Sequence, residues 1–521
     1  MFKGKKFLLA VSILVLSLVV IACADGNGDS DNDAAGSDRD ILRVGVGSNV
    51  NNMDIHGTND SASSLIHLHI FETLTRHDTE FNVYPGLATD WEMLESTEDG
   101  DLWQFNLQEG VYFQNGEPMT AHDVAFSLIR GAGAPHVAPI IGMIDPDSIE
   151  VIDDHTINIG TSIPFAPLLD HLAHPASSII SEAVVGDVAV GQANVDPYIV
   201  GTGPYILEEL VTDSHILLVR WDDYHGDAPN IREIHIDINV DPQSRLMSLE
   251  AGEVDLIQGP LLSDLDRLRD SDDMTLVEIP SAQVEYMGMN FNHDVLGIPE
   301  VRMAINYAID TAEVVRVSTE ETAQPLTGPL PPNVFGYVAG PNYGFDADRA
   351  RELMEEAGYE DGFEMELLVA MGGTTRINAA QIIQAMLSEI NITVNIQQVE
   401  WAAFLAALDG NNFDAYLGGW GIVTGDADYL MYPVFLSDNA PESNRLFVDN
   451  PEIDALIHQS REGTEEERLE VYAELLDLIH EEASRVWLQN PQLFIGLRSN
   501  VSGFDISPVQ NHWLGDIYFT D

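Results

Sequence analysis

The chain has 521 residues, 45% of them hydrophobic, and a formal net charge of −64 at pH 7. The hydrophobic content predicts a folded protein, and the length is enough for two or more domains with a large core. Nucleic acid and anionic membrane surfaces are poor partners for this chain, because they repel so large an excess of carboxylates.

The first 22 residues have the pattern of a secretory leader. Lys3, Lys5 and Lys6 give a positive start, and residues 7–22 form an unbroken run of apolar and small residues. This run is shorter than the about 20 residues that a transmembrane helix needs. Its length and its basic flank are typical of the apolar core of a signal peptide.

Cys23 is the only cysteine in the chain and follows Val20-Ile21-Ala22. An aliphatic residue three positions before a cysteine, with a small residue directly before it, resembles the lipobox of bacterial lipoproteins. The resemblance implies that residues 1–22 are removed as a signal peptide and that the thiol of Cys23 carries a diacylglycerol. An ordinary secretory signal with a chance cysteine is the alternative. With no second cysteine, disulfides cannot stabilise the fold.

Residues 23–40 are rich in Asp, Gly, Asn and Ser and offer almost nothing to bury. We therefore expect a disordered acidic tether that self-repulsion keeps extended. The first residue that can pack is Ile41. Together these segments predict a globular body outside the cytoplasmic membrane, attached by its lipid anchor only.

The charge also predicts something about the surroundings. All three lysines lie in the leader, so arginine is the only strongly basic residue after it. Arginine stays protonated at pH values where lysine begins to deprotonate, and salt screens the repulsion among carboxylates. The composition therefore favours a salty or alkaline exterior. Codon bias would explain the arginines but not the acid excess.

Sequence periodicity predicts strands and helices along the whole chain. In the first half the predicted strands are residues 41–46, 87–91, 102–107 and 231–238, and the predicted helices are residues 63–74 and 124–129. Thr120, with Asp123 three residues later, predicts a capping box for the second helix.

In the second half, strand and helix patterns alternate. The strands are predicted at 363–369, 393–399 and 415–420, and the helices at 377–390, 401–408, 451–461 and 465–483. Alternation of this kind predicts a parallel sheet with helices on its faces. Ligands gather at the carboxyl ends of strands in such sheets, so the loop after residue 420 is a candidate site.

Several motifs then resemble a known family in order and spacing. They are Asp54 and His56, residues 71–74 (FETL), residues 85–91 (PGLATDW), residues 110–124 (GVYFQNGEPMTAHDV), residues 201–205 (GTGPY), residues 301–310 (VRMAINYAID) and residues 356–359 (EAGY). Together they resemble the family 5 extracellular solute-binding proteins, the peptide and nickel binding proteins of ABC importers. The similarity extends over essentially the whole chain after the tether.

This resemblance implies an α/β fold with two lobes, like the periplasmic binding proteins of type II, cluster C. An extra small α+β domain is inserted in the first lobe. We expect the first lobe at 41–285, with the small domain at about 75–195 and a completing segment at about 495–521. The second lobe is expected at 286–494. Closure of the lobes would exclude water and so strengthen polar contacts to a ligand.

Enzyme motifs are absent from the sequence. It contains no HExxH, GxSxG, GxxxxGK or CxxC pattern. His67 and His69 are two residues apart on a predicted helix and point to different faces, so they make a poor metal pair. We therefore predict a protein that is not an enzyme, needs no cofactor and has no dedicated metal site.

The loop after the strand at 415–420 carries the main predicted ligand residues. Gly418 and Gly419 would let the backbone of a ligand approach closely. Trp420 beside them can form a flat wall, although packing in the core is the alternative for this side chain.

Peptide-binding relatives place an aspartate three residues after this tryptophan, where it pairs with the α-amino group of the ligand. Val423 occupies that position here, which counts against simple peptides. We expect Asp426 and Asp428 to supply the carboxylate for an ammonium group, or else to act as helix N-caps. The TGDAD pattern that starts at Thr424 resembles the branch associated with glutathione and related γ-glutamyl peptides.

Further candidates complete the predicted pocket. Arg376 is placed to pair with a ligand carboxylate, with a surface salt bridge as the alternative. The resemblance places Tyr286, Asn290, Ser48 and Asn49 near the cleft, where a polar ligand needs hydrogen-bond donors.

These features predict a monomeric, lipid-anchored receptor that captures a small peptide-like solute and delivers it to ABC permease subunits. Nickel chelates and oligosaccharides are alternative ligands, because one scaffold can serve many solutes. Two other classes remain. A surface hydrolase would need a catalytic constellation that the sequence lacks, and a sensory or adhesion lipoprotein would bind a ligand without an importer.

Overall fold

The computed structural model describes residues 40–520. The predicted signal peptide (1–22), the predicted lipidation site Cys23 and the predicted tether, apart from its last residue, lie outside the described residues.

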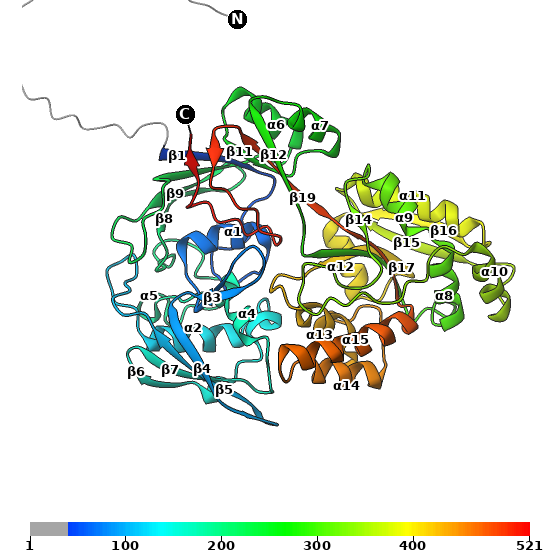
Figure 1. The fold of residues 1–521 in the computed structure, drawn as a ribbon, viewed down its shortest axis with the longest axis horizontal. Helices are drawn as coiled ribbons and strands as arrows, with labels where there is room; N and C mark the ends of the chain where they lie inside the picture. Colours follow the sequence, from blue (N-terminus) through cyan, green and yellow to red (C-terminus); the bar gives the residue numbers. More distant parts are fainter. Residues whose placement is uncertain (1–39, 521) are drawn as a thin grey trace, which may run out of the picture. The chain divides into compact units, whose positions relative to one another are not determined.

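The first lobe is built on a seven-stranded mixed sheet (Figure 1). Across the sheet its strands are β12 (Met274–Pro280), β19 (Gln492–Arg498), β11 (Leu256–Gln258), β1 (Ile41–Val46), β10 (Glu233–Ile238), β9 (His215–Arg220) and β8 (Tyr205–Val211). The central strand β1 is parallel to both β10 and β11, so the carboxyl ends of these three strands meet at one edge.

Helices cover the two faces of this sheet. Helix α1 (Ser61–Ile70) packs on one face in a core that includes Leu42 and Ile236. Helices α6 (Pro242–Ala251) and α7 (Leu265–Arg269) pack on the other face over β11 and β12. Leu256 and Ile257, adjacent on β11, belong to the two opposite cores. This is the alternation that a strand buried on both faces requires.

Helix α1 ends four residues earlier than the predicted helix 63–74. Residues 71–74 leave the helix because other segments take the backbone groups of residues 70, 73 and 74. The N–H of Gly203 donates to the carbonyl of Ile70, and the N–H groups of Leu87 and Ala88 donate to the carbonyls of Thr73 and Leu74. Tertiary pairing therefore overrides the local helical pattern here.

The small domain follows β2 (Thr75–His77) and β3 (Val83–Pro85). Its sheet has the order β4 (Ala88–Thr97), β5 (Gly100–Leu107), β7 (Thr156–Gly160) and β6 (Glu150–Asp153). Its helices are α2 (Ala121–Ala132), α3 (Ala138–Ile141), α4 (Leu168–Leu172) and α5 (Glu182–Val185). The predicted capping box at Thr120 and Asp123 is confirmed, because both of its reciprocal hydrogen bonds are present.

The second lobe is built on a six-stranded sheet. Across the sheet its strands are β14 (Gln324–Pro325), β18 (Arg485–Asn490), β13 (Gln283–Met289), β17 (Ala415–Gly421), β15 (Glu364–Ala370) and β16 (Thr393–Val399). β15 is parallel to β16 and β17, which confirms the predicted parallel unit.

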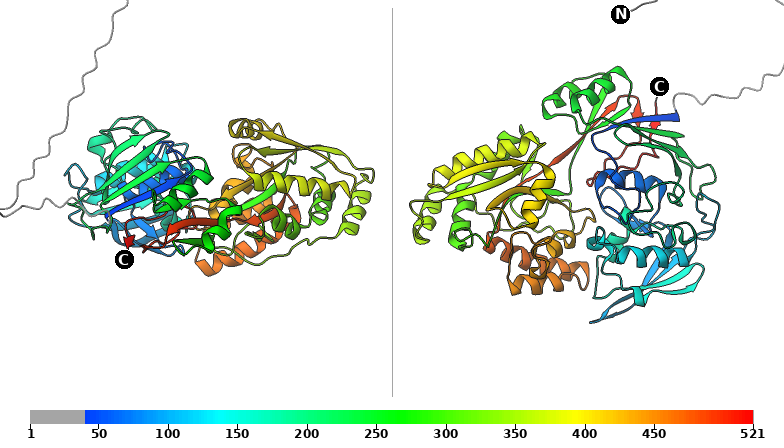
Figure 2. Two further views of the ribbon diagram at one scale, coloured as in Figure 1. Left: turned by 90° about the horizontal axis from the view of Figure 1, so that it is seen from above. Right: turned by 180° about the vertical axis from the view of Figure 1, so that it is seen from behind.

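Helices lie on both faces of this second sheet (Figures 1 and 2). One face carries α8 (Pro299–Ala308), α9 (Thr311–Ser318), α10 (Ala347–Glu356) and α11 (Thr374–Ser388). The other carries α12 (Trp401–Asp409), α13 (Asp428–Phe435), α14 (Pro451–Gln459) and α15 (Glu465–Glu482).

The remaining elements are a short pair, β20 (Val501–Ser502) and β21 (Tyr518–Phe519), and 3₁₀ turns at Pro146–Ser148, Pro175–Ser177, Leu262–Asp264 and Ser437–Asn439.

Two paired strands carry the chain between the lobes. β12 and β19 run side by side in the first sheet and continue into β13 and β18 of the second (Figures 1 and 2). The sheets therefore change at residues 281–282 and at residue 491, a few residues before the predicted boundaries at 285 and 494. β12, β13, β18 and β19 are not among the strands predicted from the sequence, so the crossings were not located in advance.

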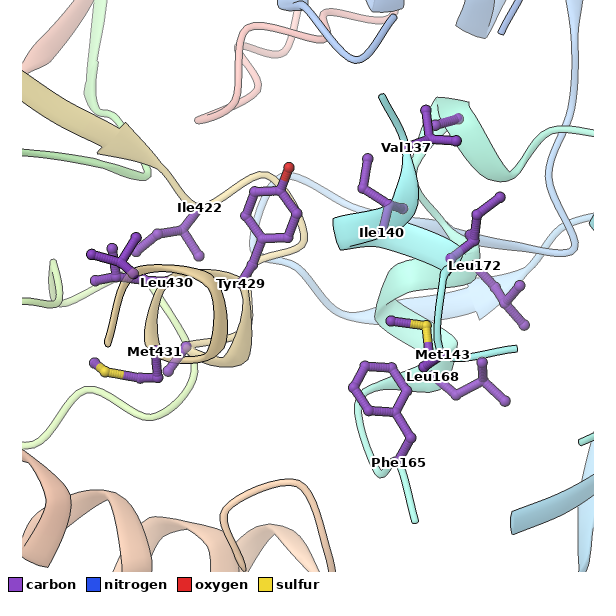
Figure 3. Close-up of a cluster of buried hydrophobic side chains, with 14 of the residues drawn as sticks. Val137, Ile140, Met143, Phe165, Leu168, Leu172, Ile422, Tyr429, Leu430 and Met431 are labelled. Carbon is purple, nitrogen blue, oxygen red and sulfur yellow. The ribbon is translucent and has the colours of Figure 1, made fainter. Parts of the chain in front are cut away.

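The small domain also packs on the second lobe. The backbone N–H of Ala166 donates to the carbonyl of Arg461 at 2.7 Å. In Figure 3 the ring of Tyr429 stands on the small-domain side of α13 and faces Ile140 of α3. Both residues belong to one buried apolar cluster that includes side chains of the two domains.

Candidate functional site

The predicted loop after β17 lies at the carboxyl end of the parallel strands of the second lobe. Trp420 is half-buried, and its indole N–H donates to the carbonyl of Tyr429 at 2.7 Å. This bond ties the end of β17 to the first turn of α13. Trp420 therefore has a packing role, and part of its ring is still exposed.

The two glycines are required by the protein itself. A Cβ atom on Gly418 would lie 2.7 Å from the ring of Tyr416, and one on Gly419 would lie 2.5 Å from the carbonyl oxygen of Val284. The predicted reason for these glycines, close approach by a ligand, is therefore not the one that the structure displays. Gly419 is exposed and Gly418 is buried.

Asp426 is held in a buried ion pair inside the second lobe. Nη2 of Arg468 lies 2.8 and 2.7 Å from the two carboxylate oxygens, and the hydroxyl of Tyr472 donates to Oδ1 at 3.2 Å. Burial opposes the charge of Arg468, but the pairing with Asp426 prevails and raises the pKa of this arginine. Asp426 is therefore fully engaged.

Asp428 has its own arginine. Nε of Arg461 lies 2.9 Å from Oδ1 of Asp428, and both side chains are almost completely buried. Nε2 of His171, from the small domain, lies 3.8 Å from Oδ2. Asp426 and Asp428, predicted to supply a carboxylate for a ligand ammonium group, here both face guanidinium groups of the protein.

The alternative prediction of helix capping is partly right. The backbone N–H of Asp428, the first residue of α13, donates to Oδ1 of Asp426 at 2.8 Å. The N-cap position itself is Ala427, and no side chain caps it. Thr424 is buried, and its hydroxyl accepts from the N–H of Asp426 at 3.4 Å.

Tyr286, Gly418 and Arg376, which are far apart in sequence, line one small cavity of about 10 Å³ together with Glu285 and Gln489. Nη2 of Arg376 lies 2.9 Å from Oε1 of Glu285, and the amide of Gln489 donates to Oε2 at 3.0 Å. The salt-bridge alternative for Arg376 is therefore the one observed. A ligand carboxylate at Arg376 would have to compete with Glu285.

Asn290 does not lie with these residues. In the antiparallel pair of β13 and β17, Val284 is opposite Trp420 and Met289 is opposite Ala415, so Asn290 lies at the other end of the sheet. Its amide donates to Oδ1 of Asn411 at 2.6 Å and to the carbonyl of Phe413 at 2.8 Å. Asn290 ties two loops together and is not part of a site at Trp420.

Ser48 and Asn49 follow β1 at the corresponding edge of the first lobe. Asn49 and Asp213 bond each other twice, at 2.6 Å between side chains and at 2.8 Å from the backbone N–H of Asp213. This pairing joins the loop to the β8–β9 turn. Ser48 is exposed and lines a cavity.

We call this cavity, of about 100 Å³, the lobe I chamber. It is lined by Val46, Gly47, Ser48, Val50, Ser61, Ala62, Leu65, Ile66, Ile216, Ile236, Gln258 and Gln510. It lies where β1 and β11 end and α1 begins. Sequence reasoning missed Gln258 and Gln510. Gln258 closes a strand and could have been found by that rule, whereas Gln510 comes from the distant C-terminal segment and carries no local signal.

Arg245 fixes the rim of the lobe I chamber. Its guanidinium donates to the carbonyl oxygens of Asn239, Gln258 and Gly259 at 2.6, 3.1 and 3.0 Å. The carbonyl of Asn239 directly follows β10, and those of Gln258 and Gly259 lie at the end of β11. Burial lowers the pKa of Arg245. A buried arginine that bonds carbonyls at two strand ends holds their loops in one arrangement.

Residues 40–520 lack two features that would change the reading of the site. No group of three or more His, Cys, Asp or Glu side chains is arranged to hold a metal ion. No helix in this range combines the length and the apolar character needed to cross a bilayer.

Comparisons with known proteins agree with this architecture. Residues 82–442 match the family model for bacterial extracellular solute-binding proteins, family 5 Middle. The glutathione-binding protein GsiB of Salmonella typhi is 28% identical over 475 residues, covering 89% of this chain and 92% of its own length. The di/tripeptide-binding protein 2 of Pseudomonas aeruginosa is also 28% identical, over 453 residues that cover 82% of this chain and 85% of its own length.

Among solved structures, the periplasmic binding protein DppA of Helicobacter pylori, in complex with the peptide STSA, superposes with a TM-score of 0.79. It is 26% identical and covers 92% of this chain and 98% of its own. The family match spans more than half of the sequence. The chain therefore belongs to the bacterial extracellular solute-binding proteins of family 5.

Proposed function

We propose that this protein is the solute receptor of an ABC importer and that it binds short peptides, including glutathione-like peptides. Family membership supports the transport role. The substrate class is supported by relatives whose names specify glutathione or di- and tripeptides, and by the DppA structure with a bound peptide.

One observation carries the proposal. Each lobe has a cavity near the carboxyl ends of its parallel strands, the lobe I chamber in the first and the cavity at Tyr286, Gly418 and Arg376 in the second. Ligands of open α/β sheets bind at such edges. A solute that contacts both edges would favour the arrangement in which the lobes approach, and the permease would recognise that arrangement.

The two crossing strands are suited to act as the hinge. The N–H and the hydroxyl of Ser281 both donate to the carbonyl of Pro491, at 2.9 and 2.8 Å. The amide of Asn490 donates to the carbonyls of Ser281 and Gln283, at 2.7 and 2.8 Å. These bonds bind the two crossings into one unit, so bending there moves each lobe as a body.

The proposed solute contacts are Ser48, Gln258 and Gln510 on the first lobe, and Gly419, the exposed part of Trp420 and Arg376 on the second. Asp426 and Asp428 are left out because arginines already hold them. A ligand carboxylate at Arg376 would displace Glu285, whose ion pair with it is partly exposed to solvent. Partly exposed pairs are weak, so this exchange costs little.

Calorimetric titration tests the proposal. The mature protein is titrated with glutathione, with di- and tripeptides, and with nickel-histidine and a cello-oligosaccharide as chemically distinct controls. We expect micromolar or tighter binding of at least one peptide and its recovery unchanged after the complex is denatured. Binding of the controls alone, or cleavage of the peptides, would overturn the proposal.

We further propose that the protein is monomeric and attached to the outer face of the cytoplasmic membrane through a lipid on Cys23. The sequence pattern of residues 1–23 supports the anchor. In cells, Cys23→Ser should move the protein from the membrane fraction to the soluble fraction. A substituted protein that stayed in the membrane fraction would contradict the anchor.

The acidic composition supports a salty or alkaline working environment. The excess carboxylates repel one another. Salt at about 1 M shortens the screening length to about 3 Å and so weakens this repulsion. Arginine in place of lysine keeps its charge at high pH.

A further inference from the structure

The lobe I chamber has an aliphatic interior that its own residues leave unfilled. The side chains that form its deep walls are each at most 6% exposed, namely Val46, Leu65, Ile66, Ile216 and Ile236. Protein interiors are normally packed to the density of organic crystals. An unfilled aliphatic cavity destabilises the fold roughly in proportion to its volume, and an apolar occupant recovers that loss.

The chemistry of the walls restricts what can enter. The chain has 86 acidic residues, yet among residues 40–520 no ionisable side chain lines the chamber. A charged group deep inside would lose its hydration, which is strongly unfavourable, and the guanidinium of Arg245 at the rim is already bonded to three carbonyl oxygens. The deep part of the chamber therefore suits an uncharged, apolar group.

The mouth is polar in a way that matches a peptide backbone. Ser48, Ser61, Gln258 and Gln510 line the chamber, and within residues 40–520 their side chains have no hydrogen-bond partner. Each glutamine amide offers one acceptor and two donors, the complement of a peptide C=O and N–H. Arg245 holds Gln258 in place through its backbone carbonyl, at 3.1 Å.

We propose that the lobe I chamber binds a branched aliphatic side chain of the solute, that of Leu, Ile or Val, while the adjacent peptide group bonds to Gln258 and Gln510. This inference rests on the proposed function and narrows it. It selects short peptides with a branched aliphatic residue over glutathione, which has no such side chain.

The test compares dipeptides that differ at one side chain. Wild-type protein is titrated with Ala-Leu, Ala-Gly, Ala-Asp and glutathione. Transfer of a leucine side chain from water to an apolar site corresponds to an affinity gain of about ten- to a hundredfold. We therefore expect Ala-Leu to bind at least about tenfold more tightly than Ala-Gly.

A variant then localises the preference. Ala62 is the second residue of α1 and lines the chamber, so Ala62→Leu places extra methyl groups in it. We expect this variant to lose about tenfold or more of its affinity for Ala-Leu and to keep that for Ala-Gly. The same substitution at Ala385, exposed on α11, should change neither. Ala62→Val serves if Ala62→Leu does not fold.

The outcomes separate the two proposals. If Ala-Leu and Ala-Gly bind equally, or if both Ala62 variants bind Ala-Leu like the wild type, the chamber is not a side-chain site and the transport function stands. If no peptide binds the wild type, the proposed function itself fails, and the inference fails with it.

Discussion

The two lobes differ in the polar side chains that lie at the carboxyl ends of their parallel strands. In the second lobe Asp426, in the loop after β17, and Asp428, at the start of α13, each lie against an arginine, from α15 and from the turn after α14 respectively. In the first lobe, the side chains of Ser48 and Gln258, which follow β1 and end β11, are uncharged and have no hydrogen-bond partner among residues 40–520, and aliphatic side chains line the cavity beside them. The loop after β17 is thus the more charged of the two regions, but its charged side chains are less free to bind a solute.

This difference shows what makes a polar residue available for binding. A carboxylate that is buried with a guanidinium has satisfied its charge inside the fold, and removing either partner leaves an uncompensated charge. An uncharged amide at a cavity mouth stays ready to bond. Four predictions follow from this contrast, from the largest expected effect to the smallest.

Acid should unfold the first lobe before the second. Burial lowers the pKa of His56 and His174 to about 3 and that of His67, His69 and His512 to about 4. All five belong to the first lobe or its small domain. An unfolded histidine has a pKa of about 6.5, so below pH 6.5 the unfolded chain binds protons that the folded chain does not.

This stability is complete above pH 6.5 and is lost as the pH falls toward 4, by about 1.4 kcal/mol per pH unit for each histidine. Urea unfolding at pH 7.5 and 5.5 measures the loss, and hydrogen exchange locates it. His174→Gln should reduce the slope, whereas His136→Gln, at an exposed position, should not. Equal stability at the two pH values would contradict the prediction.

Breaking the ion pair of Asp426 should destabilise the second lobe strongly. Arg468→Met leaves the carboxylate buried without its cation, which costs about 3–5 kcal/mol. Arg267→Met removes a pair between Arg267 and Glu250 whose arginine side chain is 56% exposed, and it should cost less than about 1 kcal/mol. Chemical denaturation of both variants gives the comparison. Similar losses would show that the buried pair contributes no more than a surface pair.

Removing the amides at the chamber mouth should affect binding without affecting folding. Gln258→Ala and Gln510→Ala each remove a bond to the solute, and each should weaken peptide binding by about 0.5–1.5 kcal/mol. Their melting temperatures should match the wild type, because these side chains have no partner within the described part of the chain. Gln243→Ala, exposed on α6, is the control. Unchanged affinity in both chamber variants would remove the amides from the site.

Salt should stabilise the protein through its surface and hardly through the buried pairs. Screening weakens repulsion among exposed carboxylates, while buried pairs are screened much less. We expect the melting temperature to rise steadily from low to molar NaCl. The loss caused by Arg468→Met should be nearly independent of salt. A melting temperature that stays flat would remove charge repulsion as a feature of this fold.

Much of the secondary structure was predictable because it depends on local periodicity. β1, β16, the capping box of α2 and the start of α15 at Glu465 lie where the pattern placed them. The end of α1 was not predictable, since residues farther along the chain bond the carbonyls of Ile70 and of residues 72–74 and stop the helix. The crossings between lobes were also hidden, because β12 continues into β13 with almost no interruption.

The candidate site was predictable only in part. Tyr286, Gly418 and Arg376 do line one cavity. Asn290 was placed at the site because it directly follows β13, the strand that carries Tyr286. The sequence pattern does not show which end of β13 lies beside Trp420.

The alternation of strands and helices in the second lobe, its parallel unit of β15, β16 and β17, and the resemblance to a solute-binding family were determined by the sequence, since periodicity and motif spacing are properties of the chain itself. Only the tertiary structure decided which polar groups are free. Asp426 is 42 residues from Arg468 along the chain, and Gln510 reaches the lobe I chamber from the C-terminal segment. Whether a charge is neutralised or an amide left open depends on neighbours that folding supplies, so the same residue type binds a solute in one place and stabilises the fold in another.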